Sequence, residues 1–102
     1  MERLLTQHPD LDAVFVADDV MAQGAMLALR ERGRRVPEDV AVIGFDDSRA
    51  ATACRPTLAT IRQPFEDMAA RMTRILLDQI DDPRRPVTSV IFDPVLVRRQ
   101  SA

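Results

Sequence analysis

Three clusters of polar side chains lie directly after runs of apolar residues, and they are the residues of this sequence that could do chemistry. The clusters are Asp18 with Asp19, Asp46 with Asp47, and Gln63. Each carboxylate can accept hydrogen bonds from two hydroxyl groups, and the glutamine amide can both donate and accept. Two carboxylates and one carboxamide on one rim suit vicinal hydroxyl groups. The residue types therefore predict a binding site for a polyol.

Each acid pair also has a purely structural interpretation. Asp18 or Asp19 could accept hydrogen bonds from the free N–H groups at the start of the following helix. The two roles can coexist, since one acid can cap the helix while its neighbour faces the cleft. Asp46 and Asp47 precede Ser48, so this pair could instead form an ordinary Asx-type turn. The sequence leaves both interpretations of each pair open.

Two further side chains could belong to a site. Phe65 lies near Gln63, and a phenylalanine is more often a core residue than a platform on which a sugar stacks. Cys54 is the only cysteine, which excludes an internal disulfide and a multi-cysteine zinc site. It has no nearby histidine, which argues against a nucleophile. We therefore predict no catalytic residue, no metal site and no cofactor.

The first half of the chain alternates strand and helix signals. Residues 13–17 form a continuous apolar run, which predicts a strand buried on both faces. Residues 20–32 predict a helix, and Gly33 stands where helices commonly end in glycine. Residues 36–39 have turn chemistry, and the β-branched run 40–45 predicts a second strand. An acid pair follows each strand.

The second half begins with small residues over 48–56, which predict an irregular segment. A short strand is expected at 58–61, and Pro64 fits the first position of a helix. The apolar residues of this helix recur at intervals of three and four, which predicts a helix laid against a sheet. They are Phe65, Met68, Ala69, Met72, Ile75, Leu76 and Ile80. The runs 87–92 and 95–97 predict two final strands.

Alternating strands and helices with short connections predict an α/β fold, a mostly parallel sheet flanked by helices, because a parallel crossover needs a helix-length connection. In open α/β sheets, ligands bind beyond the carboxyl ends of the strands. The three polar clusters fall at such ends. The polyol site is therefore expected along this edge of the sheet.

The composition limits the class of protein. The chain has 102 residues, 46% hydrophobic and 29% charged, with a net charge of −2, which predicts one soluble globular unit. Its 14 basic residues are scattered among 16 acidic ones, so no basic surface for nucleic acid is expected. No apolar run reaches membrane-spanning length and the first residues are too polar for a secretory signal. We expect the cytoplasm.

Three blocks of sequence together form a recognisable series. Residues 12–25 read DAVFVADDVMAQGA, residues 36–47 read VPEDVAVIGFDD, and residues 56–64 read PTLATIRQP. In this order and at this spacing, from about residue 11 to residue 99, they resemble the LacI/GalR family of transcriptional regulators. The family has Asn-Asp before a helix that begins Xaa-Met-Ala-Xaa-Gly, then a second strand with a double acid, then Pro-Pro-Leu-Thr-Thr-Ile-Xaa-Gln.

The resemblance implies the C-terminal lobe of a type I periplasmic-binding-protein-like sensor, whose effector lies between two α/β lobes. Residues 1–102 would be part of that domain, without its N-terminal lobe and without the DNA-binding helix-turn-helix. Asp18, Asp46 and Gln63 would contact the effector, with Phe65 on the apolar side of the pocket. Asp18 replaces the family's usual Asn, which removes an N–H donor, adds a charge and permits a ligand that carries an amine.

The resemblance also implies partners. The effector would be a sugar or related polyol, and its differential binding to two lobe arrangements would change operator affinity. The helix that begins at Val20 and the segment 51–55 resemble parts of the family's dimer interface, so a homodimer is expected. DNA would be bound only through a headpiece absent from this chain, and no membrane partner is expected. Without its second lobe, the chain should leave apolar surface uncovered and self-associate.

Two other classes of protein stay open. A periplasmic sugar-binding transport protein would share the fold and similar rim residues. An Mg²⁺-dependent enzyme or phosphoacceptor domain is the third interpretation, since paired acids at strand ends can hold a hard cation. The chain contains no lysine, which a receiver-type phosphoacceptor site would place at a strand end. We therefore expect a regulator and not an enzyme.

Overall fold

A computed structural model describes all residues from Met1 to Ala102 and divides the chain into two compact units. Unit 1 comprises Met1–Arg62 and Val95–Ala102, and unit 2 comprises Gln63–Pro94. The prediction of one compact unit is therefore wrong. The reason is that the chain leaves the sheet after Arg62 and rejoins it at Val95, which lies opposite Arg62 in the strand register.

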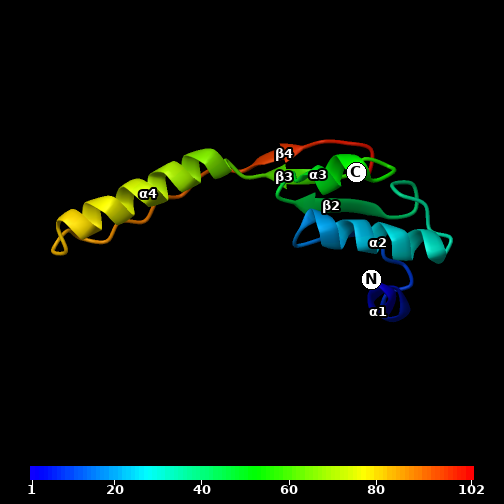
Figure 1. Cartoon of the computed structure of the whole chain (residues 1–102). Helices are drawn as coiled ribbons and strands as arrows, with labels where there is room; N and C mark the ends of the chain where they lie inside the picture. Colours follow the sequence, from blue (N-terminus) through cyan, green and yellow to red (C-terminus); the bar gives the residue numbers. More distant parts are fainter. The chain divides into compact units, whose positions relative to one another are not determined.

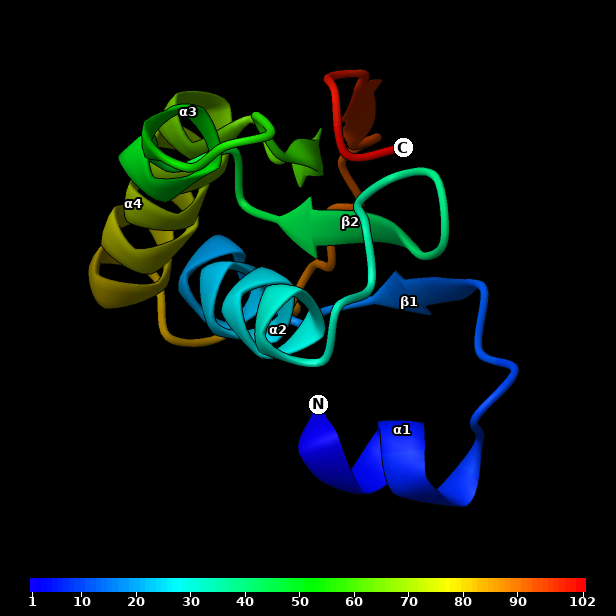
Figure 2. The ribbon, with the colours of Figure 1, turned by 90° about the vertical axis from the view of Figure 1, so that its right-hand side faces the viewer.

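Unit 1 contains four strands and three helices. Figure 1 labels its helices and the strands β2, β3 and β4, and Figure 2 labels β1. In chain order they are α1 (Glu2–Gln7), β1 (Ala13–Phe15), α2 (Asp19–Glu31), β2 (Ala41–Phe45), α3 (Arg49–Ala53), β3 (Ala59–Arg62) and β4 (Val95–Val97). Unit 2 contains the helix α4 (Phe65–Asp81). The strands β2, β3 and β4 and the helices α2 and α4 lie within about a residue of their predicted bounds. The predicted α/β class is confirmed.

The four strands form one sheet in the order β1, β2, β3, β4. The first three are parallel, with Ala13 opposite Ala41 and Gly44 opposite Thr60, whereas β4 runs antiparallel to β3. The helices α2 and α3 lie in the two crossovers that these parallel neighbours require. Because β1, β2 and β3 are parallel, their carboxyl ends share one edge of the sheet, called the carboxyl edge below.

The core of unit 1 lies between the sheet and helix α2. Helix α2 runs alongside β2 and also packs against α3 (Figure 2). Leu29 of α2 is completely buried, together with Val42 of β2 and Leu58 before β3. Burying a side chain of this size contributes about 1.5–3 kcal/mol relative to leaving it exposed. This packing fixes α2 relative to the strands whose ends carry the acid pairs.

Strand β1 lies at the edge of the sheet and pairs only with β2. Its residues Ala13 and Phe15 are exposed, and the ring of Phe15 meets that of Phe45 edge-on with centroids 6.1 Å apart. The prediction that this strand is buried on both faces is therefore wrong. An apolar run indicates that a strand is suited to burial. It does not determine whether other segments of the chain cover both faces of that strand.

Helix α2 ends as its glycine predicts. Gly33 has a φ of +71°, in the left-handed region that glycine adopts without strain. Its N–H donates to the carbonyl of Arg30 at 3.0 Å, and the N–H of Arg34 donates to the carbonyl of Leu29 at 2.9 Å. These two bonds form the Schellman arrangement, which satisfies carbonyl groups at the end of the helix.

The segment 48–56, predicted to be irregular, contains the short helix α3. The Ser48 hydroxyl caps it by accepting from the N–H of Ala50 at 3.2 Å, and Ala51 is completely buried. A serine followed by an alanine-rich run is a signal for the start of a helix, and the prediction of an irregular segment does not take it into account. The contact between α3 and α2 stabilises this single turn, which would be too short to persist alone.

Unit 2 departs from prediction in its packing. Helix α4 forms where its periodicity predicts, directly after Pro64, but none of its residues is buried. Residues 87–92 form no strand, and Val87 and Ile91 are 85% and 92% exposed. An extended segment becomes a strand only when another strand supplies ladder hydrogen bonds. None of the helices combines the length and the apolar character that a membrane crossing requires.

Gly44 allows a close approach between β2 and the first turn of α2. A Cβ atom at this position would lie 2.5 Å from Oδ1 of Asp19 and 2.8 Å from Cδ2 of Leu58. Real Cβ contacts are longer, so any larger residue would force α2 or β3 away from β2. Only a glycine here keeps Asp19 in its observed place.

We expect Gly44→Ala to destabilise the protein by about 1–3 kcal/mol, because the added methyl group overpacks this contact. Urea denaturation followed by circular dichroism would measure it. The matched control is Gly24→Ala within α2, where a Cβ would meet nothing within 4 Å. That control should be neutral or stabilising by up to about 1 kcal/mol. Equal stabilities for Gly44→Ala and the unsubstituted protein would contradict the close-contact argument.

Candidate functional site

The carboxyl edge of unit 1 carries two of the four predicted effector contacts. Asp18 follows β1, and Asp46 follows β2 directly. The other two belong to unit 2: Gln63 is bonded to the last residue of β3, and Phe65 is the first residue of α4. Phe65 is 50% exposed, so it is not a core residue of this chain.

Asp18 is the N-cap of helix α2. Its Oδ1 atom accepts a hydrogen bond from the N–H of Met21 at 2.7 Å, and its backbone is extended, with φ −152° and ψ 164°. The capping interpretation is therefore confirmed for this member of the first acid pair. The side chain is half-buried, and Oδ1 is the atom that the cap uses. Oδ2 takes no part in the cap.

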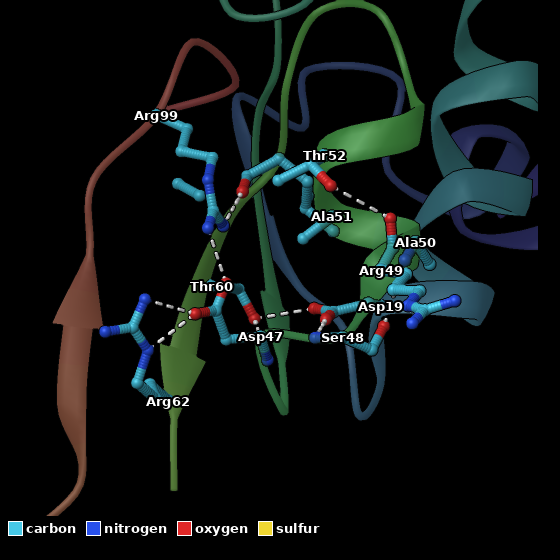
Figure 3. Close-up of polar contacts among 12 residues, drawn as sticks. Asp19, Asp47, Ser48, Arg49, Ala50, Ala51, Thr52, Thr60, Arg62 and Arg99 are labelled. Atoms are coloured by element: carbon cyan, nitrogen blue, oxygen red, sulfur yellow. Dashed lines mark hydrogen bonds and ion pairs between the residues drawn. The ribbon is translucent and has the colours of Figure 1, made fainter.

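Asp19, the other member of the pair, is directed into the protein (Figure 3). The residue is 1% exposed, and its Oδ1 accepts from the hydroxyl of Thr60 at 2.6 Å. Its Oδ2 accepts from the N–H of Ser48, also at 2.6 Å. The idea that the neighbour of the capping acid faces the cleft is therefore wrong. Asp19 instead ties the start of α2 to β3 and to the loop after β2.

The second acid pair makes a sharp turn out of β2. Asp46 and Asp47 have φ values of 101° and 53°, which non-glycine residues other than Asp and Asn rarely adopt. The N–H of Asp46 donates to the carbonyl of Ile61 at 2.8 Å, so the turn stays attached to β3. The N–H of Ser48, the donor of an Asx turn on Asp46, donates to Asp19 instead. The turn is stabilised by long-range contacts rather than by an ordinary Asx turn.

The Asp47 carboxylate holds two arginines (Figure 3). Its Oδ2 accepts from Nε of Arg62 at 2.6 Å, and Nη2 of the same side chain lies 2.6 Å from that oxygen. Its Oδ1 accepts from Nη2 of Arg99 at 2.6 Å, and Arg99 also donates to the carbonyl of Leu58. Asp47 therefore joins the ends of β2 and β3 to the segment after β4.

The same contacts set the charge of Asp47, whose side chain is 8% exposed. Burial alone would raise its pKa, but the hydrogen bonds from Arg99 and Arg62, with their positive charges, outweigh this effect and lower the pKa. Asp47 is therefore a charged, fully engaged carboxylate. Of the four acids, Asp19 and Asp47 hold distant segments of unit 1 together, and Asp18 and Asp46 lie at the carboxyl edge.

Sequence reasoning missed the positioning residues Thr60, Arg62 and Arg99. Their contacts span 41, 15 and 52 residues, so no local spacing predicts them. The chain also contains no group of three His, Cys, Asp or Glu side chains placed to hold a metal ion. The carboxyl edge therefore carries two half-buried carboxylates, which can accept hydrogen bonds, and one exposed, ion-paired arginine.

We expect Asp47→Asn to destabilise the protein by about 2–3 kcal/mol at pH 7, because two arginines lose their charged partner. Since the folded-state pKa of Asp47 lies below the unfolded value of about 3.9, this stabilisation is complete above that pH and is lost as the pH falls below it. Urea midpoints at pH 7, 5 and 3 should therefore show a difference from the unsubstituted protein that narrows only at pH 3.

Asp10→Asn is the control for the pH series, because Asp10 is exposed and takes no part in this cluster. It should leave the midpoints nearly unchanged at all three values. A gap between Asp47→Asn and the unsubstituted protein that stays constant down to pH 3 would contradict the assignment of the ion pairs.

Comparison with known proteins places this geometry in a family. The family profile described as "Periplasmic binding protein-like domain" matches residues 1–102. The HTH-type transcriptional regulator CelR of Thermobifida fusca is 46% identical over 99 residues, which are 96% of this chain and 29% of CelR. The HTH-type transcriptional repressor PurR of Edwardsiella ictaluri is 43% identical over 99% of this chain and 30% of PurR.

Solved structures agree with these relatives. A complex of the transcriptional regulator CelR with cellobiose has a TM-score of 0.94 and 42% identity, and covers 99% of this chain and 31% of that chain. The lac repressor dimer bound to operator and the anti-inducer ONPF has a TM-score of 0.84 and 32% identity, and covers 97% of this chain and 34% of that chain. The chain thus spans about 30% of the length of its curated relatives. It belongs to the periplasmic binding protein-like domain family, in the form found in LacI-type transcriptional regulators.

Proposed function

We propose that this chain is the effector-sensing part of a LacI-type DNA-binding transcriptional regulator and that the effector is a sugar or a related polyol. The observation that carries the proposal is the likeness over nearly the whole chain to a regulator solved with cellobiose. The 46% identity to CelR supports the same class of function. The relatives named above are transcriptional regulators and not enzymes, which favours the regulator over the transport and enzyme interpretations.

The carboxyl edge supports a ligand with hydroxyl groups. Asp18 keeps Oδ2 outside its cap, and Asp46 leaves β2 in a turn that β3 holds in place. Carboxylate oxygens accept charge-assisted hydrogen bonds from hydroxyl groups. We propose Asp18, Asp46 and Gln63 as direct contacts, and Phe65, half exposed at the start of α4, as an apolar contact.

The remaining proposals concern the protein to which this chain would belong. Residues 1–102 would be part of the effector-binding domain, largely its C-terminal lobe, and DNA would be bound through a separate headpiece. A homodimer is supported by the lac repressor, whose structure is a dimer, and by Val20, Met21 and Leu27 of α2, which are 48–68% exposed. Self-association of the isolated chain and a cytoplasmic location follow from the same interpretation.

The direct test is calorimetric titration of the protein as its reading frame encodes it, including any residues before or after these 102. Cellobiose and ribose are the probes, because relatives are solved with each of them. Saturable binding of either saccharide supports the proposal. Binding of neither, in a protein whose circular dichroism is that of a folded α/β domain, would count against a sugar effector.

Asp46→Asn tests the site itself. The substitution keeps the shape and the tolerance of a positive φ but removes the charge, and we expect saccharide affinity to fall about 10- to 100-fold. The control is Asp12→Asn, at the amino end of β1, whose backbone carbonyl rather than side chain bonds to the sheet. It should bind like the unsubstituted protein. An unchanged affinity in Asp46→Asn would remove Asp46 from the site.

A pair of substitutions at Asp18 separates its capping role from its ligand role. Asp18→Asn retains a capping side chain, whereas Asp18→Ala loses the bond to Met21 and should destabilise the protein by about 1 kcal/mol. We expect both variants to change saccharide affinity, but only Asp18→Ala to lower the urea midpoint. If affinity changes only in Asp18→Ala, in parallel with stability, then Asp18 is a cap and not an effector contact.

A further inference from the structure

We propose that Arg62 is a specificity-determining residue of the effector site, which donates hydrogen bonds to oxygen acceptors of the ligand and disfavours ligands that carry an ammonium group. The inference rests on the proposed function, since it assigns a donor to the same carboxyl edge. Arg62 is not among the residues that the sequence predicted to contact the effector.

The position of Arg62 places it beside Asp46. Arg62 is the last residue of β3, and Phe45 lies opposite Ile61 in the register of β2 and β3. The hydrogen bond from the N–H of Asp46 to the carbonyl of Ile61, at 2.8 Å, belongs to this last pair. Asp46 follows Phe45 and Arg62 follows Ile61, so the two residues come directly after one paired position of β2 and β3 at the carboxyl edge.

The guanidinium group is fixed before any ligand arrives. Nε and Nη2 both lie 2.6 Å from Oδ2 of Asp47, and Arg99 holds the other oxygen of that carboxylate. A flexible arginine would lose side-chain entropy on binding, but this one has already lost it in the ion pair. Nη1 takes no part in the contact with Asp47, and the side chain is 59% exposed. The free part of the guanidinium thus remains accessible to a ligand.

Among the proposed contacts, only the Gln63 amide can donate a hydrogen bond. Asp18 and Asp46 offer carboxylate oxygens, which only accept, whereas a sugar hydroxyl both donates and accepts and a ring oxygen only accepts. Arg62 supplies charged N–H groups for those ligand oxygens. Its positive charge also offsets the attraction that the extra carboxylate of Asp18 would exert on an amine. The predicted tolerance for an amine-bearing ligand is thereby reduced in favour of a neutral saccharide.

The test compares two probes, cellobiose and the diamine obtained by deacetylation of chitobiose, by calorimetric titration of the protein as its reading frame encodes it. Unsubstituted protein should bind cellobiose more tightly. Arg62→Gln should lower cellobiose affinity about 10- to 100-fold and change diamine affinity much less, so that the ratio of the two affinities falls. Arg62→Lys retains the charge without the planar fork and should give an intermediate ratio.

The matched control is Arg35→Gln. Arg35 makes a similar exposed ion pair, with Nε and Nη2 at 2.9 and 2.7 Å from the two oxygens of Asp39, but it precedes the amino end of β2. Its substitution should leave both affinities unchanged. Urea midpoints of all the variants show whether a change in affinity follows from a change in stability.

The outcomes are distinct. Arg62→Gln with cellobiose affinity within twofold of the unsubstituted protein overturns the inference and leaves the proposed function standing. An equal loss for both probes also overturns it. With a lower urea midpoint, Arg62 would act only through the fold, and with an unchanged midpoint it would not discriminate between the two ligands. If the unsubstituted protein binds neither probe, the sugar-effector proposal is wrong and the inference falls with it. A selective loss for cellobiose supports it.

Discussion

The buried carboxylate of Asp19 is the constraint on which the arrangement of unit 1 depends. A carboxylate that is 1% exposed is costly to bury unless both oxygens receive hydrogen bonds, and Thr60 and Ser48 supply them at 2.6 Å. Those donors come from β3 and from the loop after β2, so one side chain ties two other segments to the start of α2. Gly44 makes this possible, because any side chain there would occupy the place of the carboxylate.

The two residues of each acid pair have different roles, and both pairs follow the same pattern. In each pair, one acid lies at the carboxyl edge and the other makes long-range contacts: Asp18 caps α2 locally while the buried Asp19 binds Thr60 and Ser48, and Asp46 leaves the sheet while Asp47 binds two arginines. Adjacent residues in a turn point in different directions, so a double acid provides a buried or ion-paired carboxylate and a half-buried carboxylate at the edge from one short segment. The contacts of Asp19 and Asp47 determine where Asp18 and Asp46 can lie.

Asp47 also connects the two points at which the chain leaves unit 1 and returns to it. The chain departs from unit 1 after Arg62 and returns at Val95, and Asp47 holds both Arg62 and Arg99 beyond the returning strand. The departing and returning segments are therefore tied to the turn that carries Asp46. Within unit 2, the apolar stripe of α4 and the extended residues 87–92 stay largely exposed, since the unit contains too little chain to cover them.

The sequence by itself determined the local features of this protein. Periodicity predicted α2, α4 and most of the strands, Gly33 predicted the end of α2, and the double acids marked the carboxyl edge, because helix and strand preferences act over a few residues. Tertiary structure alone decided that β1 is an exposed edge strand, that the chain forms two units, and that residues 87–92 form no strand. It also decided which acid of each pair is buried and that Thr60, Arg62 and Arg99 position them. The contacts of Asp19 and Asp47 are with partners 15 to 52 residues away, and the free energy of a buried charge is set by those partners rather than by its sequence neighbours.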